Sequence, residues 1–136
     1  MSSDVSPVSA PRPWRAWLWP LAIAALIVMA SHRPRLAGPS IEHIDKVTHF
    51  AVFGLLATLV CRLGTGRRAA LGAWALVAAF GACDEWHQSF VPGRTSELAD
   101  WIADASGAAV AVVAYAGWTG YRRLLETPCG RARTRN

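Results

Sequence analysis

Four stretches of the chain contain no Asp, Glu, Lys or Arg, and they restrict the possible folds more than any other feature. They cover residues 16–31, 47–61, 69–83 and 105–121. A helix needs about 20 apolar residues to cross the hydrocarbon core of a bilayer, so each stretch is a few residues short. The alternative is a soluble helical core, but only 17% of the residues are charged, which leaves too little polar sequence to cover such a core. The sequence therefore predicts a membrane protein.

Flanking residues can supply the missing length of each crossing. The fold class that follows is all-α: a polytopic membrane bundle of four transmembrane helices within a domain spanning 14–126. The helices are expected at about 14–32, 45–62, 68–88 and 98–122. The segment between the first two helices contains Pro34, Gly38 and Pro39, which break a helix, so it is expected to be a loop. Flexible tails are expected at 1–13 and 127–136.

The arginines predict the orientation of the bundle. If the N-terminus is cytoplasmic and the chain crosses four times, ten of the 14 basic residues fall in cytoplasmic segments. Such an excess is typical of cytoplasmic loops, so both termini are expected on that side. The formal net charge of +5 would also suit a nucleic-acid binder. Because the topology already explains the basic residues, we expect the lipid bilayer and no nucleic acid as a partner.

A secretory signal peptide is an alternative interpretation of the first apolar stretch. Two arginines precede it, and Val28, Met29 and Ala30 resemble a cleavage site. Cleavage would leave three crossings and an external N-terminus. The apolar run is somewhat long for a signal peptide and the cleavage site is weak, so we expect this helix to be retained.

The acidic residues show the opposite bias to the arginines. Carboxylate side chains are too short to reach water from below the headgroups as arginine can, and a charge there is costly. Such side chains persist where they pair with one another or line a wet cavity. Seven of the nine acidic residues fall on the outer side: Glu42, Asp45, Asp84, Glu85, Glu97, Asp100 and Asp104.

Three short motifs place these acids at the outer ends of the helices. The spacing of Asp45 and His49 puts both on one face of the second helix. A turn at Pro92 and Gly93 presents Arg94 after the third helix. The fourth helix opens with acidic residues at helical spacing. Because paired buried charges cost less than separate ones, we expect one hydrogen-bonded network that contains Asp45, His49, Arg94, Asp100 and Asp104.

Roles can be assigned to these residues by chemical type. Imidazole and carboxyl groups can transfer protons, and a guanidinium can hold a phosphate or carboxylate. The catalytic candidates, if there is catalysis, are His49, Asp45, Glu85, Asp100 and Asp104. The candidates for binding are Lys46, Asp84, Gln88 and Arg94.

The same residues include possible metal ligands. No compact zinc motif such as HExxH is present. Ligands could still converge from three helices, as they do in di-metal bundles. With the acids and His49 spread over distant segments, we expect neither a metal nor another cofactor.

The order and spacing of these motifs resemble the VanZ-like family of small bacterial membrane proteins. The resemblance covers residues 44–113 and rests on Asp45-Lys46 with His49-Phe50, Asp84-Glu85 with Gln88, Pro92-Gly93-Arg94-Thr95, and Asp100 with Asp104 and Gly107. It implies a multi-pass protein of the bacterial inner membrane. It also implies a link to reduced susceptibility to teicoplanin, a lipidated glycopeptide that acts on cell-wall precursors.

Three functional hypotheses stay open at this point. The first is an envelope protein whose outward-facing polar pocket binds or acts on a lipid-linked cell-wall precursor or a lipoglycopeptide. The second is a membrane-embedded acid/base enzyme that acts on a phosphorylated or lipid-linked substrate. The third is a small transporter, which needs an oligomer because four short helices are too few for a transport path. The sequence leaves open whether the chain is an enzyme.

Overall fold

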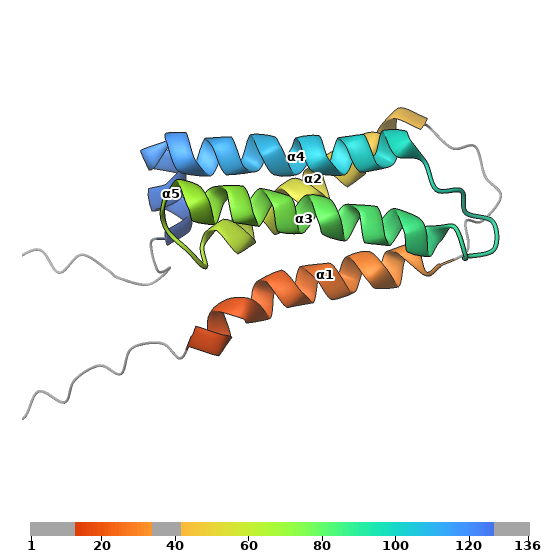
Figure 1. The fold of residues 1–136 in the computed structure, drawn as a ribbon, viewed down its shortest axis with the longest axis horizontal. Coiled ribbons are helices and arrows are strands. Elements are labelled where there is room, and N and C mark those ends of the chain that lie inside the picture. Colours follow the sequence, from red (N-terminus) through yellow and green to blue (C-terminus); the bar gives the residue numbers. More distant parts are fainter. Residues whose placement is uncertain (1–12, 34–41, 127–136) are drawn as a thin grey trace, which may run out of the picture.

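The computed structural model describes residues 13–33 and 42–126, and every element in these ranges is helical (Figure 1). A 3-10 turn, Pro13–Trp17, leads into α1, and a bundle of long helices follows before a short final helix. The α-helices are α1 Leu18–Ser31, α2 Glu42–Cys61, α3 Gly66–Gln88, α4 Leu98–Gly117 and α5 Thr119–Glu126. The all-α prediction is confirmed for these residues. Apart from Pro13, which begins the 3-10 turn, the tails predicted at 1–13 and 127–136 lie outside the described residues, as does most of the predicted loop before α2.

The fourth predicted helix is two helices in the structure. It was expected over 98–122, but α4 ends at Gly117 and Trp118 takes an extended conformation with φ −107° and ψ 97°. The chain then re-enters a helix at Thr119. Glycine is common at helix ends, which fits the break at this point. Tyr121 of α5 packs back onto the bundle, where its hydroxyl lies 3.2 Å from the hydroxyl of Thr58.

The four long helices alternate in direction, so their ends meet in two groups (Figure 1). At one end α1 and α3 finish and α2 and α4 begin; we call this the polar end of the bundle. The opposite end carries α5 and the tight connection between α2 and α3. Short loops between neighbouring antiparallel helices give this alternation. Residues far apart in the sequence are therefore brought together at the polar end.

The closest helix pair is α2 with α4, which run in the same direction. Glycines allow this approach: a Cβ at Gly107 would collide with the backbone of Phe50, and one at Gly54 would lie 3.2 Å from the Gly107 carbonyl oxygen. Small residues permit such close contact between membrane helices. Around this crossing the buried core contains Phe53, Ala57 and Ala108.

Two indole hydrogen bonds join α3 to α4. Trp101 donates to the carbonyl oxygen of Ala78 at 3.0 Å, and Trp74 donates to that of Ala105 at 3.2 Å. Each helix thus supplies one tryptophan to the other. The first helix, α1, packs less extensively on the bundle than α2, α3 and α4 pack on one another.

Within residues 13–33 and 42–126, three segments are long and apolar enough to cross a bilayer. They are Trp14–Ser31, Ile44–Cys61 and Leu98–Gly117. Large apolar side chains stay exposed along these segments, among them Leu21, Met29, Leu55, Ile102 and Val113. A surface of this kind is costly in water and suits a lipid environment. The helix α3 is not among the three; it has Arg67 and Arg68 in its first turn and Asp84 and Glu85 in its last turns.

Candidate functional site

The side chains that the sequence singled out gather at the polar end of the bundle, in separate groups. The first group joins α2 to α4. His49 Nδ1 lies 2.9 Å from Asp104 Oδ1, and Asp104 is fully buried. One helical turn nearer the end, Lys46 forms salt bridges with Asp100 at 3.0 Å and with Glu97 at 3.3 Å. The crossing of α2 over α4 at Gly107 places these residues opposite one another.

The second group joins α3 to the end of α1. The Ser31 hydroxyl donates to Asp84 Oδ2 at 2.7 Å, and Gln88 Nε2 donates to the same oxygen at 2.9 Å. The amide oxygen of Gln88 in turn accepts a hydrogen bond from Arg94 at 3.2 Å. All three residues on the helices are buried. Asp84 is therefore held by donors from two helices.

Arg94 reaches this group from a β-turn. Its backbone N–H donates to the Val91 carbonyl oxygen at 3.1 Å, and Gly93 has φ +79°. In a type II turn the second residue is often proline and the third is a glycine with positive φ, as Pro92 and Gly93 are here. The turn predicted from the sequence at these two residues is therefore present. The guanidinium also donates to the carbonyl oxygens of Ala30 at 2.8 Å and Arg33 at 3.1 Å. The turn thus delivers a cation to the C-terminal end of α1, where cations are favourable.

Glu85 lies on a different face of α3 from Asp84 and Gln88, as helical spacing predicts. It is 4% exposed, and its Oε2 accepts a hydrogen bond from the backbone N–H of Glu97 at 2.9 Å. Glu97 is the N-cap residue of α4, so Glu85 satisfies a free amide at the start of that helix from the neighbouring helix.

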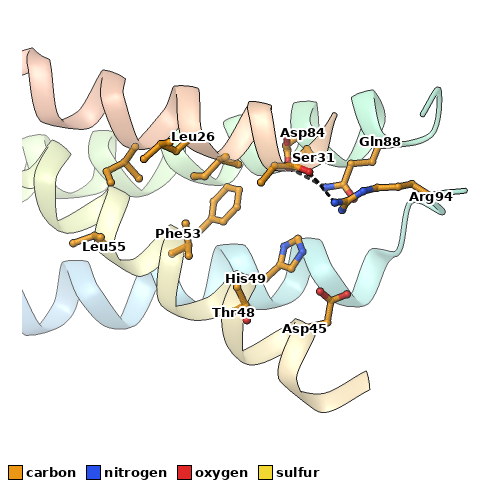
Figure 2. A pocket seen from close by; sticks show the side chains of 14 residues that line it. Leu26, Ser31, Asp45, Thr48, His49, Phe53, Leu55, Asp84, Gln88 and Arg94 are labelled. Carbon is orange, nitrogen blue, oxygen red and sulfur yellow. Dashed lines mark hydrogen bonds between the residues drawn. The ribbon is translucent and has the colours of Figure 1, made fainter. Parts of the chain in front are cut away.

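A cavity of about 370 Å³ lies between α1 and α2 and reaches α3 and Arg94 (Figure 2). Its apolar lining residues include Ile23, Leu26, Val52 and Phe53. Its polar part lies toward the polar end of the bundle. Five residues predicted as site residues line it: Asp45, His49, Asp84, Gln88 and Arg94.

The single network expected from the sequence is divided in the structure. Among the described contacts, His49 pairs with Asp104, whereas Arg94 pairs with Gln88 and the end of α1. The other predicted residues (Lys46, Glu85, Asp100 and Asp104) pack between helices and do not line the cavity. Asp45 lines the cavity and has an interaction of its own. Arg94 comes from the turn after α3 and contacts the end of α1, whereas His49 comes from α2 and contacts Asp104 of α4.

Ser31 is a member of the site that the sequence did not reveal. It is the last residue of an apolar helix, 4% exposed, and donates to a carboxyl on α3. A lone serine after an apolar run gives no signal of this role. Gly81 is also part of the site, because a Cβ there would lie 3.0 Å from Asp104 Oδ2.

Among the described residues, two sets of side chains have the geometry to hold a metal ion. In each set, one possible ligand atom per residue lies within 4.8 Å of the others. The first set is Asp45 and His49 of α2 with Asp100 of α4, and the second is His49 of α2, Glu85 of α3 and Asp104 of α4. Both contain one imidazole and two carboxylates.

Comparison with known protein families places the chain beside a family of membrane proteins. The VanZ/LLP1 family model matches residues 8–119, which is most of the chain. No curated protein and no solved structure matches the chain. The matched region includes α1, which the motifs quoted from the sequence did not cover, and it contains the whole polar site. The chain is therefore a membrane protein that belongs to the VanZ-like family.

Proposed function

We propose that this chain is a multi-pass protein of the bacterial inner membrane that binds an anionic amphiphile of the cell envelope, such as a lipid-linked cell-wall precursor. In this proposal α1 to α4 each cross the bilayer, both termini are cytoplasmic, and the polar end faces outward. The positive-inside bias of the arginines supports that orientation. A contribution to teicoplanin resistance would then follow from binding or altering lipid-linked wall components.

The observation that carries the proposal is the division of the cavity into an apolar part and a polar part (Figure 2). Pockets for amphiphiles combine apolar walls with a few polar groups that fix the head group. The apolar residues Leu26 and Leu55 lie on opposite sides of the cavity and are 58% and 48% exposed. This opening faces the surface that lipid would cover. An acyl or prenyl chain can therefore enter sideways from the bilayer.

Arg94 supplies the charge that recognises an anionic head group. A guanidinium has five N–H donors, and three hydrogen bonds to Ala30, Arg33 and Gln88 hold it in place. The remaining donors are available to a phosphate oxygen. The carboxyl groups of Asp45 and Asp84 favour a head group that also offers hydroxyl or amine donors. Sugar- and peptide-bearing lipid phosphates have both features.

The test is binding of a polyprenyl phosphate to the purified full chain in detergent, measured by native mass spectrometry. Leu26→Trp fills the apolar part of the cavity. Leu21→Trp is the matched control, because Leu21 is 60% exposed on the same helix and does not line the cavity. We expect at least a tenfold loss of affinity in Leu26→Trp and none in Leu21→Trp. Equal affinity in the two variants would contradict the proposal.

The uncharged polyprenol tests the role assigned to Arg94. Wild type should prefer the phosphate to the alcohol, and Arg94→Gln should lose that preference while it still binds the alcohol. An Arg94→Gln variant that keeps the preference for the phosphate would contradict a role for Arg94 in head-group recognition.

A second candidate function, acid/base catalysis on the bound lipid, is favoured by the His49–Asp104 pair. Nδ1 is engaged at 2.9 Å by a buried carboxyl, which orients the imidazole and leaves Nε2 without a hydrogen-bond partner among the described residues, so that it can transfer a proton. His49 also lines the cavity. Catalysis predicts turnover of a polyprenyl pyrophosphate, abolished in His49→Gln with binding retained. Binding without turnover in wild type leaves only the first function.

A further inference from the structure

Three buried side chains from three different helices meet behind the cavity. They are His49 of α2, Glu85 of α3 and Asp104 of α4, and one ligand atom from each lies within 4.8 Å of the others. Glu85 is 4% exposed and Asp104 is 0% exposed. The group is separate from the apolar part of the cavity, because His49 lines the cavity and Glu85 and Asp104 do not.

Two oxygens in this group have no hydrogen-bond partner among the described residues. They are Glu85 Oε1 and Asp104 Oδ2, and both are inaccessible to solvent. Buried polar atoms in folded proteins are almost always paired, and an unpaired carboxylate oxygen is especially unfavourable. Two such oxygens beside one imidazole therefore indicate a missing positive partner.

The nearby basic side chains are engaged elsewhere. Lys46 is held by Asp100 and Glu97. Arg94 is held by Gln88 and by carbonyl oxygens of α1 and the residues after it. Within the described ranges, the only ion-pair partner of either carboxyl group is His49. A divalent cation would compensate the two carboxylates where no basic side chain does.

The shape of the group is fixed by its surroundings. The backbone N–H of Glu97 holds Glu85 Oε2 at 2.9 Å, which leaves Oε1 free for another contact. Gly81 leaves room for Asp104, whose Oδ2 would lie 3.0 Å from a Cβ at that position. Contacts of this kind orient metal ligands in known sites.

We propose that His49, Glu85 and Asp104 bind one divalent transition-metal ion. One imidazole nitrogen with carboxylate oxygens suits zinc, manganese or iron, whereas calcium and magnesium prefer oxygen ligands alone. The alternative set of Asp45, His49 and Asp100 is less suitable, because Lys46 already occupies Asp100 Oδ1 at 3.0 Å. This proposal goes beyond amphiphile binding and does not depend on it.

The test is titration of the chelator-treated full chain in detergent with Co²⁺, followed by visible absorption. We expect one equivalent of Co²⁺ to bind wild type, and affinity to fall at least tenfold in His49→Gln and in Glu85→Gln. His87→Gln is the control, since it disrupts the exposed contact in which His32 Nδ1 and His87 Nε2 lie 3.3 Å apart. That variant should bind Co²⁺ as wild type does.

Two outcomes would overturn the proposal: no saturable Co²⁺ binding by wild type, or binding that His87→Gln abolishes and His49→Gln does not. X-ray absorption of the wild-type complex provides a readout that needs no variant. It should show one imidazole and otherwise oxygen ligands, and two imidazoles would also overturn the proposal. No lipid is present in these experiments, so their failure is distinguishable from failure of amphiphile binding.

Discussion

Arg94 shows how one side chain can fasten an otherwise loosely held helix. Its guanidinium spreads three hydrogen bonds over two carbonyl oxygens at the end of α1 and one amide of α3. The last carbonyl groups of a helix have no partner within the helix, so an arginine from another segment can satisfy them. The planar fork of arginine fits this arrangement, and the single ammonium group of lysine does not.

Arg94→Lys is therefore expected to destabilise the protein although it keeps the charge. We expect a loss of about 1 kcal/mol in the free energy of unfolding, because at least one hydrogen bond to a carbonyl oxygen is lost. The measurement is reversible unfolding in mixed detergent micelles. Arg68→Lys, at an exposed position of α3, is the control and should leave the stability unchanged. An equal effect in the two variants would show that Arg94 does not fasten α1.

The two glycines Gly107 and Gly72 should respond in opposite directions to the same substitution. In Gly107→Ala the new Cβ collides with the backbone of Phe50, and we expect a loss of about 1–3 kcal/mol. In Gly72→Ala the new Cβ meets nothing within 4 Å, and the higher helix propensity of alanine should add about 0.5–1 kcal/mol. Thermal unfolding of the two variants measures both changes in stability, a loss for Gly107→Ala and a gain for Gly72→Ala. A stable Gly107→Ala would contradict the close crossing of α2 and α4.

At the scale of elements, the molecule consists of a tightly packed unit and an attached helix. The helices α2, α3 and α4 share the buried core and are joined by indole hydrogen bonds. The first helix, by contrast, buries Pro20, Ile27 and Ser31 and leaves most of its side chains exposed. The cavity lies along this weaker junction. An amphiphile can therefore enter between α1 and α2 without disturbing the core.

Ser31→Ala tests the polar part of that junction. The buried carboxyl of Asp84 loses the donor at 2.7 Å and keeps Gln88, so we expect a cost of about 1–2 kcal/mol. Thr48→Ala is the matched control, because the Thr48 hydroxyl donates to the Ile44 carbonyl oxygen of its own helix and is exposed. Its stability should change by less than about 0.5 kcal/mol. Unfolding in mixed micelles distinguishes the two, and an equal change in both would contradict a role for Ser31 in holding α1.

At the scale of the whole molecule, much of the fold could be predicted from the apolar stretches and from the alternating direction of the helices that they form. Charge-free runs indicated the long helices, and short connections placed the motifs around His49, Arg94 and Asp104 at one end. Pairing between helices could not be predicted, because it depends on the crossing of α2 and α4 at Gly107. That crossing decides that Asp104 meets His49, and that Arg94 meets α1 instead.

The burial of Glu85 illustrates the same limit at a single position. Helical periodicity separated it from Asp84 and Gln88, which was correct for one face of α3. It gave no sign that the adjacent face is covered by the start of α4, where the Glu97 N–H needs an acceptor. Periodicity reports which residues share a face, and only the packed structure reports what covers each face.

The account depends most on the claim that the polar end and its cavity open to the outer side of the membrane. The direct measurement is modification of single cysteines by a membrane-impermeant maleimide in intact spheroplasts, with Cys61, Cys83 and Cys129 replaced by alanine. Thr95→Cys reports the loop at the polar end, Thr48→Cys the cavity wall, and Thr65→Cys the opposite end. We predict that Thr95→Cys and Thr48→Cys react in intact spheroplasts and that Thr65→Cys reacts only after lysis. The reverse pattern, with Thr65→Cys reactive from outside and Thr95→Cys protected, would contradict the account.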